Sequence, residues 1–376
     1  IYKKNYRPIT LQNINYKIFY KILAIRLAKI IHRLISCNQF AYIPGRVISD
    51  PIYIIRLLIH RARYKKLNQA IVFADLAKAF DTVGHIFIEM ILRAMGFPER
   101  FISWVMMSFR KSEVQLIVNG FLTDPYNPGA GGKQGDPLFP LIFICVMLGL
   151  IAIIEMDDTI AGILLPYTNK RLKILAFADD CNLFAGHVND PTRYVYHLNF
   201  FHEASGLGSN WDKTIGMCLG YWAENTPPEF VSTGFNWVNH EESIRVLGIN
   251  VGNETSPSES WNKLISKVRT FAATHNISTL TLMGRIHLAN ASILGSLVYH
   301  MTHLYVSTDQ RRTAKSVMNQ FTNGNKVKTQ ISYNDKIKPH TDGGPPVVLL
   351  DIHSMTEALS TKVLDVIANS GSTSKS

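Results

Sequence analysis

Three aspartates stand out as the residues whose type and spacing could do chemistry. Asp75 ends the short apolar run QAIVFAD (69–75), and Asp179 and Asp180 lie together inside AFADDCNLFA (176–185). Aspartate is rarely buried unless it is paired or bound to a metal ion. If the flanking strands are neighbours, three carboxylates meet at one edge of a sheet, where like charges repel. A divalent cation removes that repulsion, and carboxylate oxygens suit Mg²⁺.

Such a site suits phosphoryl transfer. Two Mg²⁺ ions, about 3.5–4 Å apart, can stabilise both the attacking and the leaving oxygen of an in-line displacement. The alternative for Asp179 and Asp180 is an ordinary hairpin turn, where aspartate is common. Taken alone, the pair favours that turn, so the other motifs of the chain have to decide.

Composition and charge restrict the class of protein. The chain has 376 residues, 47% of them hydrophobic, which is enough for two or three domains or one large multi-lobed domain. Its 39 Lys and Arg against 28 Asp and Glu give a formal charge of +11, which favours an anionic partner such as nucleic acid. Its four cysteines form no CxxC pair, which argues against a disulfide framework or a zinc site and fits a reducing compartment. The sequence begins at Ile1 and shows no signal peptide, so we expect an intracellular fragment of a longer product.

The elements that must position the aspartates are predicted from hydrophobic periodicity. The run 69–75 indicates a buried strand, and RLKILAFADDCNLFAG (171–186) indicates a strand, a tight turn and a second strand. IRVLGINVG (244–252) indicates one further strand, and the chain after Trp261 has a helical period. Strands mixed with helices, with an antiparallel hairpin, give an α+β class.

The apolar segment 138–154 is predicted to be a buried core helix. It is uncharged, but its length is at the lower limit of a membrane span. Pro137 and Pro140 open it and Glu155 closes it, so we expect no membrane partner. The acidic pair Asp157–Asp158 just beyond is interpreted as a helix end and a solvated loop.

Several motifs follow one another in a characteristic order. They are NYRPITLQNINYKIFYKILAIRL (5–27), QFAYIPGRVISD (39–50), FADLAKAFDTV (73–83), GGKQGDPLFPLIF (131–143), FADD (177–180), SGLGSNWDKT (205–214), VLGI (246–249) and LMGRIHLANASIL (282–294). In this order they resemble the reverse transcriptase of non-LTR (LINE-type) retrotransposons, over nearly the whole chain.

The resemblance implies a right-hand polymerase of the α+β class. Residues 1–70 would form the fingers, truncated upstream, and residues 71–250 the palm with motifs A to E and finger insertions. Residues 251–369 would form a mostly helical thumb and connection, followed by a polar tail at 370–376. The endonuclease domain and the Cys/His knuckle of whole elements have no counterpart in these motifs.

The resemblance also assigns catalytic roles. Asp75, Asp179 and Asp180 would bind two Mg²⁺ ions, for which Mn²⁺ could substitute, with Asp180 the more peripheral ligand. The backbone carbonyl of Leu76 would add a ligand. Lys213 would protonate the leaving pyrophosphate; the alternative is a solvated loop lysine.

Four further residues would bind the nucleotide. Phe80 matches the steric gate, whose ring excludes a ribose 2′-OH; the alternative is a packing role in the core. Gln134 and Gly135 would line the incoming nucleotide and the template base, and Arg7 would grip the triphosphate through its guanidinium fork.

Contacts to nucleic acid are expected from four basic residues. Arg46 would contact the template backbone, and Lys133 stands where the family has arginine. Arg61 and Arg63 belong to the basic run RARYKK (61–66), which could follow phosphates but is also typical of the solvated end of a helix.

The implied activity is RNA-directed DNA synthesis. A primer 3′-OH would attack the α-phosphate of a dNTP on an RNA template, with a DNA primer or target, and the resemblance implies a nuclear location. A group II intron-type maturase, a decayed relic that only binds RNA and an RNA-dependent RNA polymerase are the alternatives. DLAKAFDTV and MGRIHLAN favour the LINE type over the maturase, the three aspartates argue against a relic, and Phe80 argues against an RNA product.

Overall fold

The computed structural model describes residues 10–339 and 341, except 111, 167, 255–256, 275–278, 305, 325–331 and 340. The chain divides into two compact units: unit 1 is Ile1–Leu247 with Val251–Asn253, and unit 2 is Gly248–Asn250 with Glu254–Ser376. The division lies close to the predicted limit between palm and thumb, although the assignment of fingers, palm and thumb stays a prediction. Arg7 and the predicted tail 370–376 lie outside the described residues.

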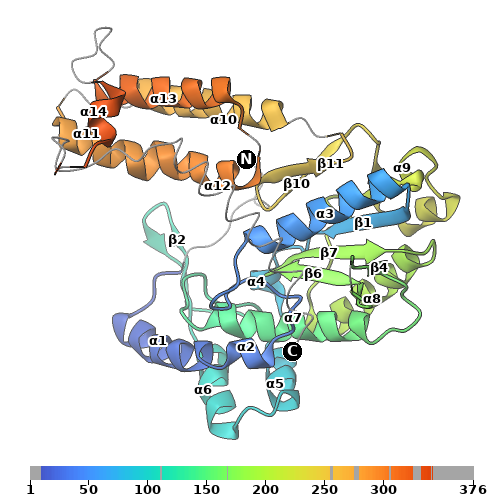
Figure 1. Cartoon of the computed structure of the whole chain (residues 1–376). Helices are drawn as coiled ribbons and strands as arrows, with labels where there is room; N and C mark the ends of the chain where they lie inside the picture. The colour runs from blue at the N-terminus through green and yellow to red at the C-terminus, as the bar shows by residue number, and fades with distance from the viewer. Residues whose placement is uncertain are drawn as a thin grey trace. The chain divides into compact units, whose positions relative to one another are not determined.

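A five-stranded sheet forms the centre of unit 1 (Figure 1). Its order is β6 (Ile174–Phe177), β7 (Asp180–Ala185), β1 (Asn68–Ala74), β8 (Ile215–Gly220) and β9 (Asn236–Val238). Neighbouring strands are antiparallel except β8 and β9, which are parallel. The predicted strand at 69–75 and the predicted hairpin at 171–186 are therefore confirmed.

Strand β1 is buried on both faces because its residues alternate between two cores. Ala70, Val72 and Ala74 belong to one core together with α7 (Phe139–Glu155). Ile71 belongs to the other, together with α3 (Ser49–Lys65). Helices thus cover both faces of the sheet, α3 on one side and α7 on the other (Figure 1).

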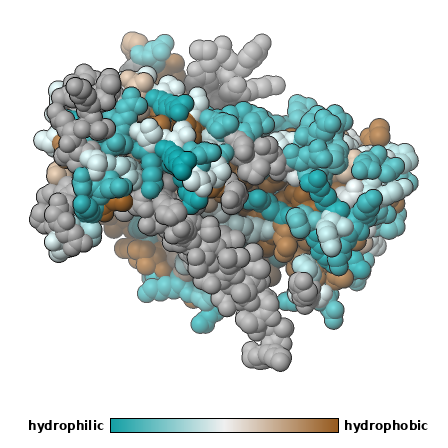
Figure 2. All heavy atoms as spheres, turned by 45° about the horizontal axis from the view of Figure 1, so that its top comes forward, coloured by the Kyte–Doolittle hydropathy of each residue, from teal (hydrophilic) through white to brown (hydrophobic). Residues whose placement is uncertain are grey.

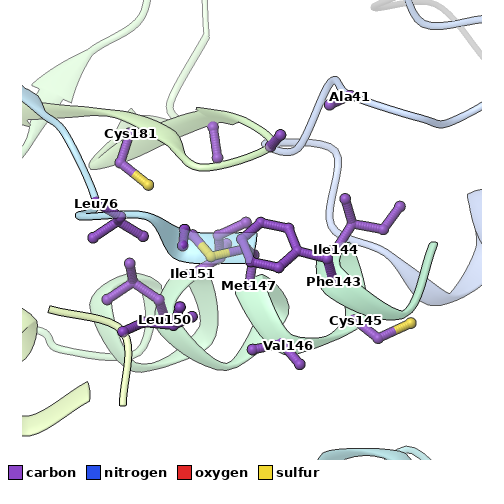
Figure 3. Close-up of a cluster of buried hydrophobic side chains, with 14 of the residues drawn as sticks. Ala41, Leu76, Phe143, Ile144, Cys145, Val146, Met147, Leu150, Ile151 and Cys181 are labelled. Carbon is purple, nitrogen blue, oxygen red and sulfur yellow. The ribbon is translucent and has the colours of Figure 1, made fainter. Parts of the chain in front are cut away.

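Helix α7 is the predicted core helix. Figure 3 shows Phe143, Met147 and Ile151 pointing toward Leu76, whereas Val146 points to the opposite side. All four α7 side chains are buried, so the helix is packed on more than one face. Within the described ranges, no helix is long and apolar enough to cross a membrane.

The remaining elements of unit 1 surround this centre. The helices are α1 (Ile14–Ala28), α2 (Ile31–Leu34), α4 (Ala79–Thr82), α5 (His85–Ala94), α6 (Glu99–Arg110), α8 (Asp190–Ser205), α9 (Tyr221–Glu224) and the 3₁₀ helix η2 (Pro228–Thr233). Two short hairpins pair β2 (Ile117–Val118) with β3 (Phe121–Leu122) and β4 (Ile163–Leu164) with β5 (Arg171–Leu172).

Figure 2 shows hydrophilic and hydrophobic residues interspersed on one face of the molecule, which is ordinary for a protein surface.

The single strand predicted at 244–252 is wrong. The segment forms two paired strands, β10 (Ser243–Val246) and β11 (Ile249–Gly252). Leu247 and Gly248 have φ of 48° and 91°, so the chain reverses there. The left-handed conformation suits the glycine and is unusual for leucine, which is why the apolar run gave no signal of a turn.

From α10 onward the described part of unit 2 is helical, as predicted after Trp261. It contains α10 (Pro257–Thr274), α11 (Leu282–Leu288), the π-helical segment η3 (Ala289–Leu294), α12 (Gly295–His303), α13 (Thr308–Thr322) and α14 (Tyr333–Ile337). Trp261, Leu297 and Phe321 lie in its separate hydrophobic core.

Asp157 is not part of a solvated loop, contrary to the prediction. Its side chain is only 8% exposed, and Arg193 of α8 donates two hydrogen bonds to its Oδ2. His197 Nε2 lies 2.6 Å from the same oxygen. The carboxylate therefore joins the end of α7 to α8. The sequence did not indicate this role, because the partners of Asp157 lie in a helix that is distant along the chain.

The four cysteines are free, as predicted from their spacing. Cys37 is exposed, whereas Cys145, Cys181 and Cys218 are buried. Burial raises the pKa of the Cys145 thiol to about 12 and that of Cys218 to about 11.

Candidate active site

The turn between β6 and β7 carries Asp179. Phe177 pairs with Asp180 across the hairpin, so Ala178 and Asp179 are the two turn residues. Ala178 adopts a left-handed φ of 56°, which costs a residue with a side chain about 1 kcal/mol or more. Asp179 is partly buried and Asp180 is exposed.

The strand register brings Asp75 to this turn. Ala74, the last residue of β1, pairs with Cys181 of β7, and extending the antiparallel register by one residue places Asp75 opposite Asp180. The predicted neighbourhood of the two strands is therefore confirmed. In the described part of the chain, no group of three or more His, Cys, Asp or Glu side chains is arranged so that it could hold a metal ion. The role of the aspartates as ligands stays a prediction.

The segment 208–213 lies against Asp75. The backbone N–H of Asn210 donates to the Asp75 carbonyl at 2.7 Å, and the Asn210 side-chain amide donates to its Oδ2 at 3.2 Å. The Lys213 ammonium is 4.0 Å from the same Oδ2 and its side chain is 71% exposed. Leu76 forms a β-bridge with Ser209. Lys213 is thus brought to the site as expected. Asn210 was missed, although it lies within SGLGSNWDKT, because nothing in the sequence marks an amide as a partner of Asp75.

Phe80 is held between the core and a second aromatic residue. Its ring stacks on Phe143 of α7 with centroids 4.4 Å apart and meets Tyr42 edge-on at 6.4 Å. Tyr42 is 49% exposed and has a φ of 59°. Burial, and then the charge of Asp179, raises the pKa of Tyr42. The sequence analysis missed Tyr42, which lies beside both Phe80 and the Asp179 turn.

The loop with Gln134 and Gly135 is a tight turn before α7. The N–H of Asp136 donates to the Lys133 carbonyl at 3.0 Å, and Gly135 has a φ of 96°. A positive φ at the third position of a turn is the reason glycine is required there. The N–H of Gly132 donates to the Phe80 carbonyl at 2.8 Å, so the loop is fixed to the predicted gate residue.

Asp136 anchors the same loop to two helices. Its Oδ1 accepts the N–H groups of Leu138 and Phe139 at 2.7 and 3.1 Å and so caps the start of α7. The Tyr16 hydroxyl of α1 donates to its Oδ2 at 2.5 Å. Burial, and then the Asp136 charge, raises the pKa of Tyr16. The Lys133 ammonium lies 4.5 Å from the centre of the Tyr16 ring and makes a cation–π contact with it.

The arginines predicted to contact nucleic acid donate to backbone carbonyls of unit 1. Arg46 donates to Ile35 and Ser36 at 3.3 and 2.6 Å and also to Gln39. Arg61 donates to Leu164 at 2.5 Å and Arg63 to Asn253 at 3.0 Å. Arg46 is therefore a structural residue of its loop, whatever else it contacts.

Comparison with known proteins agrees with this geometry. The family described as reverse transcriptase (RNA-dependent DNA polymerase) matches residues 1–251. The transposon TX1 149 kDa protein of Xenopus laevis is 28% identical over 82% of this chain and 24% of its own length. The Pol polyprotein of retrotransposable element R2 from Nasonia vitripennis is 31% identical over 48% of this chain and 17% of its own length. The chain thus spans at most about a quarter of these two relatives.

Among solved structures, telomerase from Candida tropicalis, with a fragment of telomeric RNA, has a TM-score of 0.42 and 12% identity. That match covers 82% of this chain and 45% of the telomerase chain. Proteins of the matched family use divalent metal ions, an RNA template and a nucleic-acid primer. The predicted α+β class is confirmed by the mixed helices and antiparallel strands of the structure. The strand register brings the motif residues of β1 to those of the β6–β7 turn. The family model matches two thirds of the length of this chain, and the chain therefore belongs to the reverse transcriptase family.

Proposed function

We propose that this chain is the polymerase part of a non-LTR retrotransposon protein and copies RNA into DNA from a DNA primer. The observation that carries the proposal is the register of β1 and β7, which puts Asp75 beside the Asp179–Asp180 turn. The relatives' names, transposon TX1 and retrotransposable element R2, support the type of element. A nuclear location, where chromosomal DNA ends can serve as primers, belongs to the same proposal.

The donor set fits divalent metal ions, because carboxylate and carbonyl oxygens are the ligands that Mg²⁺ prefers. Asp75, Asp179 and the carbonyl of Leu76 would hold two Mg²⁺ ions, or Mn²⁺, with Asp180 as a peripheral ligand. Bound there, the ions would supply positive charge to the attacking and leaving oxygens.

The protein's own groups would orient and protonate the substrates. In the overall reaction, the primer 3′-OH attacks the α-phosphate of a dNTP and pyrophosphate leaves. Lys213 lies at the edge of the site with an exposed ammonium, from which it can give a proton to the pyrophosphate. Asn210 holds the Asp75 carboxylate through its amide and so fixes the direction of that oxygen.

The fixed turn at Gln134 and Gly135 would lie against the nucleotide. Glycine at this point lets the backbone approach a ligand closely. The bond from Gly132 to the Phe80 carbonyl would keep this loop and the sugar-facing ring at a constant spacing.

Primer extension tests the proposal directly. The purified chain should extend a DNA primer on an RNA template with dNTPs and Mg²⁺, and Asp179→Asn should not. Extension by wild type alone supports RNA-directed DNA synthesis. Equal products from both proteins, or none from either, contradict it and leave only the family and the fold.

Replacing Phe80 by valine should admit ribonucleotides. The Phe143 stack prevents the ring from moving aside, so the 2′-OH would clash with it in wild type. We expect the preference for dNTP over rNTP, measured as the ratio of kcat/KM values, to fall by at least about tenfold. Phe87→Val is the matched control, because Phe87 packs on Phe201, in the same core. Unchanged sugar selection in Phe80→Val would remove Phe80 from the site.

A further inference from the structure

We infer that Gln39 is a positioning residue for Asp179: its buried amide fixes the turn that presents this carboxylate, and Arg46 fixes the loop that carries Gln39. The inference rests on the proposed function only in taking Asp179 as a metal ligand.

The Gln39 side chain binds both backbone groups of Ala178. Its Oε1 accepts the Ala178 N–H at 2.9 Å, and its Nε2 donates to the Ala178 carbonyl at 3.3 Å. Oε1 also accepts the N–H of Ala41 at 3.0 Å. Gln39 is 0% exposed, so no bulk water can replace these bonds if the amide is removed. Leaving such buried groups unpaired destabilises the turn.

The Asp179 turn needs such a clamp. Ala178 has the left-handed φ of 56°, which is unfavourable for alanine, and Asp179 is the next residue. The direction of the Asp179 side chain therefore depends on the Ala178 peptide groups that Gln39 holds. A residue 139 positions away in the sequence thus fixes the turn.

The backbone around Gln39 is itself attached to the edge of the sheet. The Ala176 N–H of β6 donates to Asn38 O at 2.8 Å, and the Phe40 N–H donates to Ala176 O at 2.9 Å. These bonds make a parallel bridge between Gln39 and Ala176. The segment 38–40 therefore extends the sheet beside β6, and the Gln39 side chain reaches the turn from there.

Arg46 completes the arrangement from inside the same loop. Its guanidinium donates to the carbonyls of Ile35, Ser36 and Gln39. A planar group with five N–H donors suits three converging carbonyls, and lysine could not reproduce that fork. Arg46 therefore acts on Asp179 through Gln39.

A purely structural role of Gln39 would lower the stability of the fold without changing the affinity for Mn²⁺. A positioning role would change that affinity, so a Mn²⁺ titration distinguishes the two roles. We would titrate Mn²⁺, followed by electron paramagnetic resonance, into the full chain as wild type, Asp179→Asn, Gln39→Met and Gln69→Met. Gln69 is the matched control, because it is a buried glutamine of β1 whose Oε1 has no hydrogen-bond partner among the described residues. Residues that orient ligands typically affect metal affinity by about 10–100-fold.

We expect Gln39→Met to weaken Mn²⁺ binding about tenfold and to lower kcat with the KM for dNTP unchanged. Gln69→Met should bind Mn²⁺ as wild type does. Wild-type affinity in Gln39→Met overturns the inference while Asp179→Asn still reports on the proposed function. Wild-type affinity in Asp179→Asn contradicts the metal site itself. If Gln39→Met does not fold, Arg46→Lys takes its place, and unchanged Mn²⁺ binding there overturns the inference.

Discussion

Asp75→Asn should lower the single-turnover rate of primer extension by at least about 10²–10³-fold, the usual size of losing one group that stabilises transition-state charge. Asparagine keeps the shape of the side chain, and its amide oxygen can still accept the hydrogen bond from Asn210. The substitution removes only the negative charge, which lies 4.0 Å from the Lys213 ammonium. Unfolding by urea should therefore be unchanged.

Asp81→Asn is the control for Asp75. Asp81 lies six positions later in the same motif, in the short helix α4. Its N–H closes a turn to the Lys78 carbonyl, which the substitution keeps. We expect Asp81→Asn to extend primers at the wild-type rate. If the two variants lose activity equally, the charge at the end of β1 has no special role.

Asp157→Ala should lower the free energy of unfolding by about 2–3 kcal/mol. The substitution removes the partner of Arg193 and His197 and the acceptor for the Thr159 N–H. The Arg193 side chain is 39% exposed, so water compensates part of its loss, and the cost stays below that of a fully buried pair. Urea titration followed by tryptophan fluorescence measures the free energy of unfolding of wild type and variant. Asp158→Ala is the control, because Asp158 is exposed, and its free energy of unfolding should stay within about 0.5 kcal/mol of wild type.

The contribution of Asp157 should also depend on pH. Burial alone would raise the pKa of this carboxyl, but hydrogen bonds from Thr159, His197 and Arg193 hold it well below its ordinary range. A carboxyl with a lowered pKa in the folded state stabilises above its unfolded pKa, about 3.9, and loses this effect as the pH falls. The gap between wild type and Asp157→Ala should therefore be full at neutral pH and shrink below about pH 4. A gap that grew in acid would refute this account.

Much of the fold could be predicted because hydrophobic patterning records it. Three segments show this: the strand that ends before Asp75, the hairpin that carries Asp179, and helix α7. Each consists largely of buried apolar residues, so its own sequence is enough to predict it. The turn at Leu247, between β10 and β11, was not predicted because leucine rarely adopts a positive φ and is not a typical turn residue.

The supporting residues of the site could not be predicted in the same way. Gln39 and Asn210 act through amides on partners 139 and 135 positions away, so only the folded register makes them neighbours. Arg46 and Arg61 donate to main-chain carbonyls, which every residue has, so no residue type marks these contacts in the sequence.

Cys37 gives experimental access to the loop that carries Gln39. It is exposed and lies two positions before Gln39, whereas the other three thiols are buried with raised pKa values. Because the thiolate is the reacting form, a maleimide dye at neutral pH should modify Cys37 alone, without any engineered cysteine. The fluorescence of that single dye would then follow this loop in real time as metal, nucleotide and primer are added.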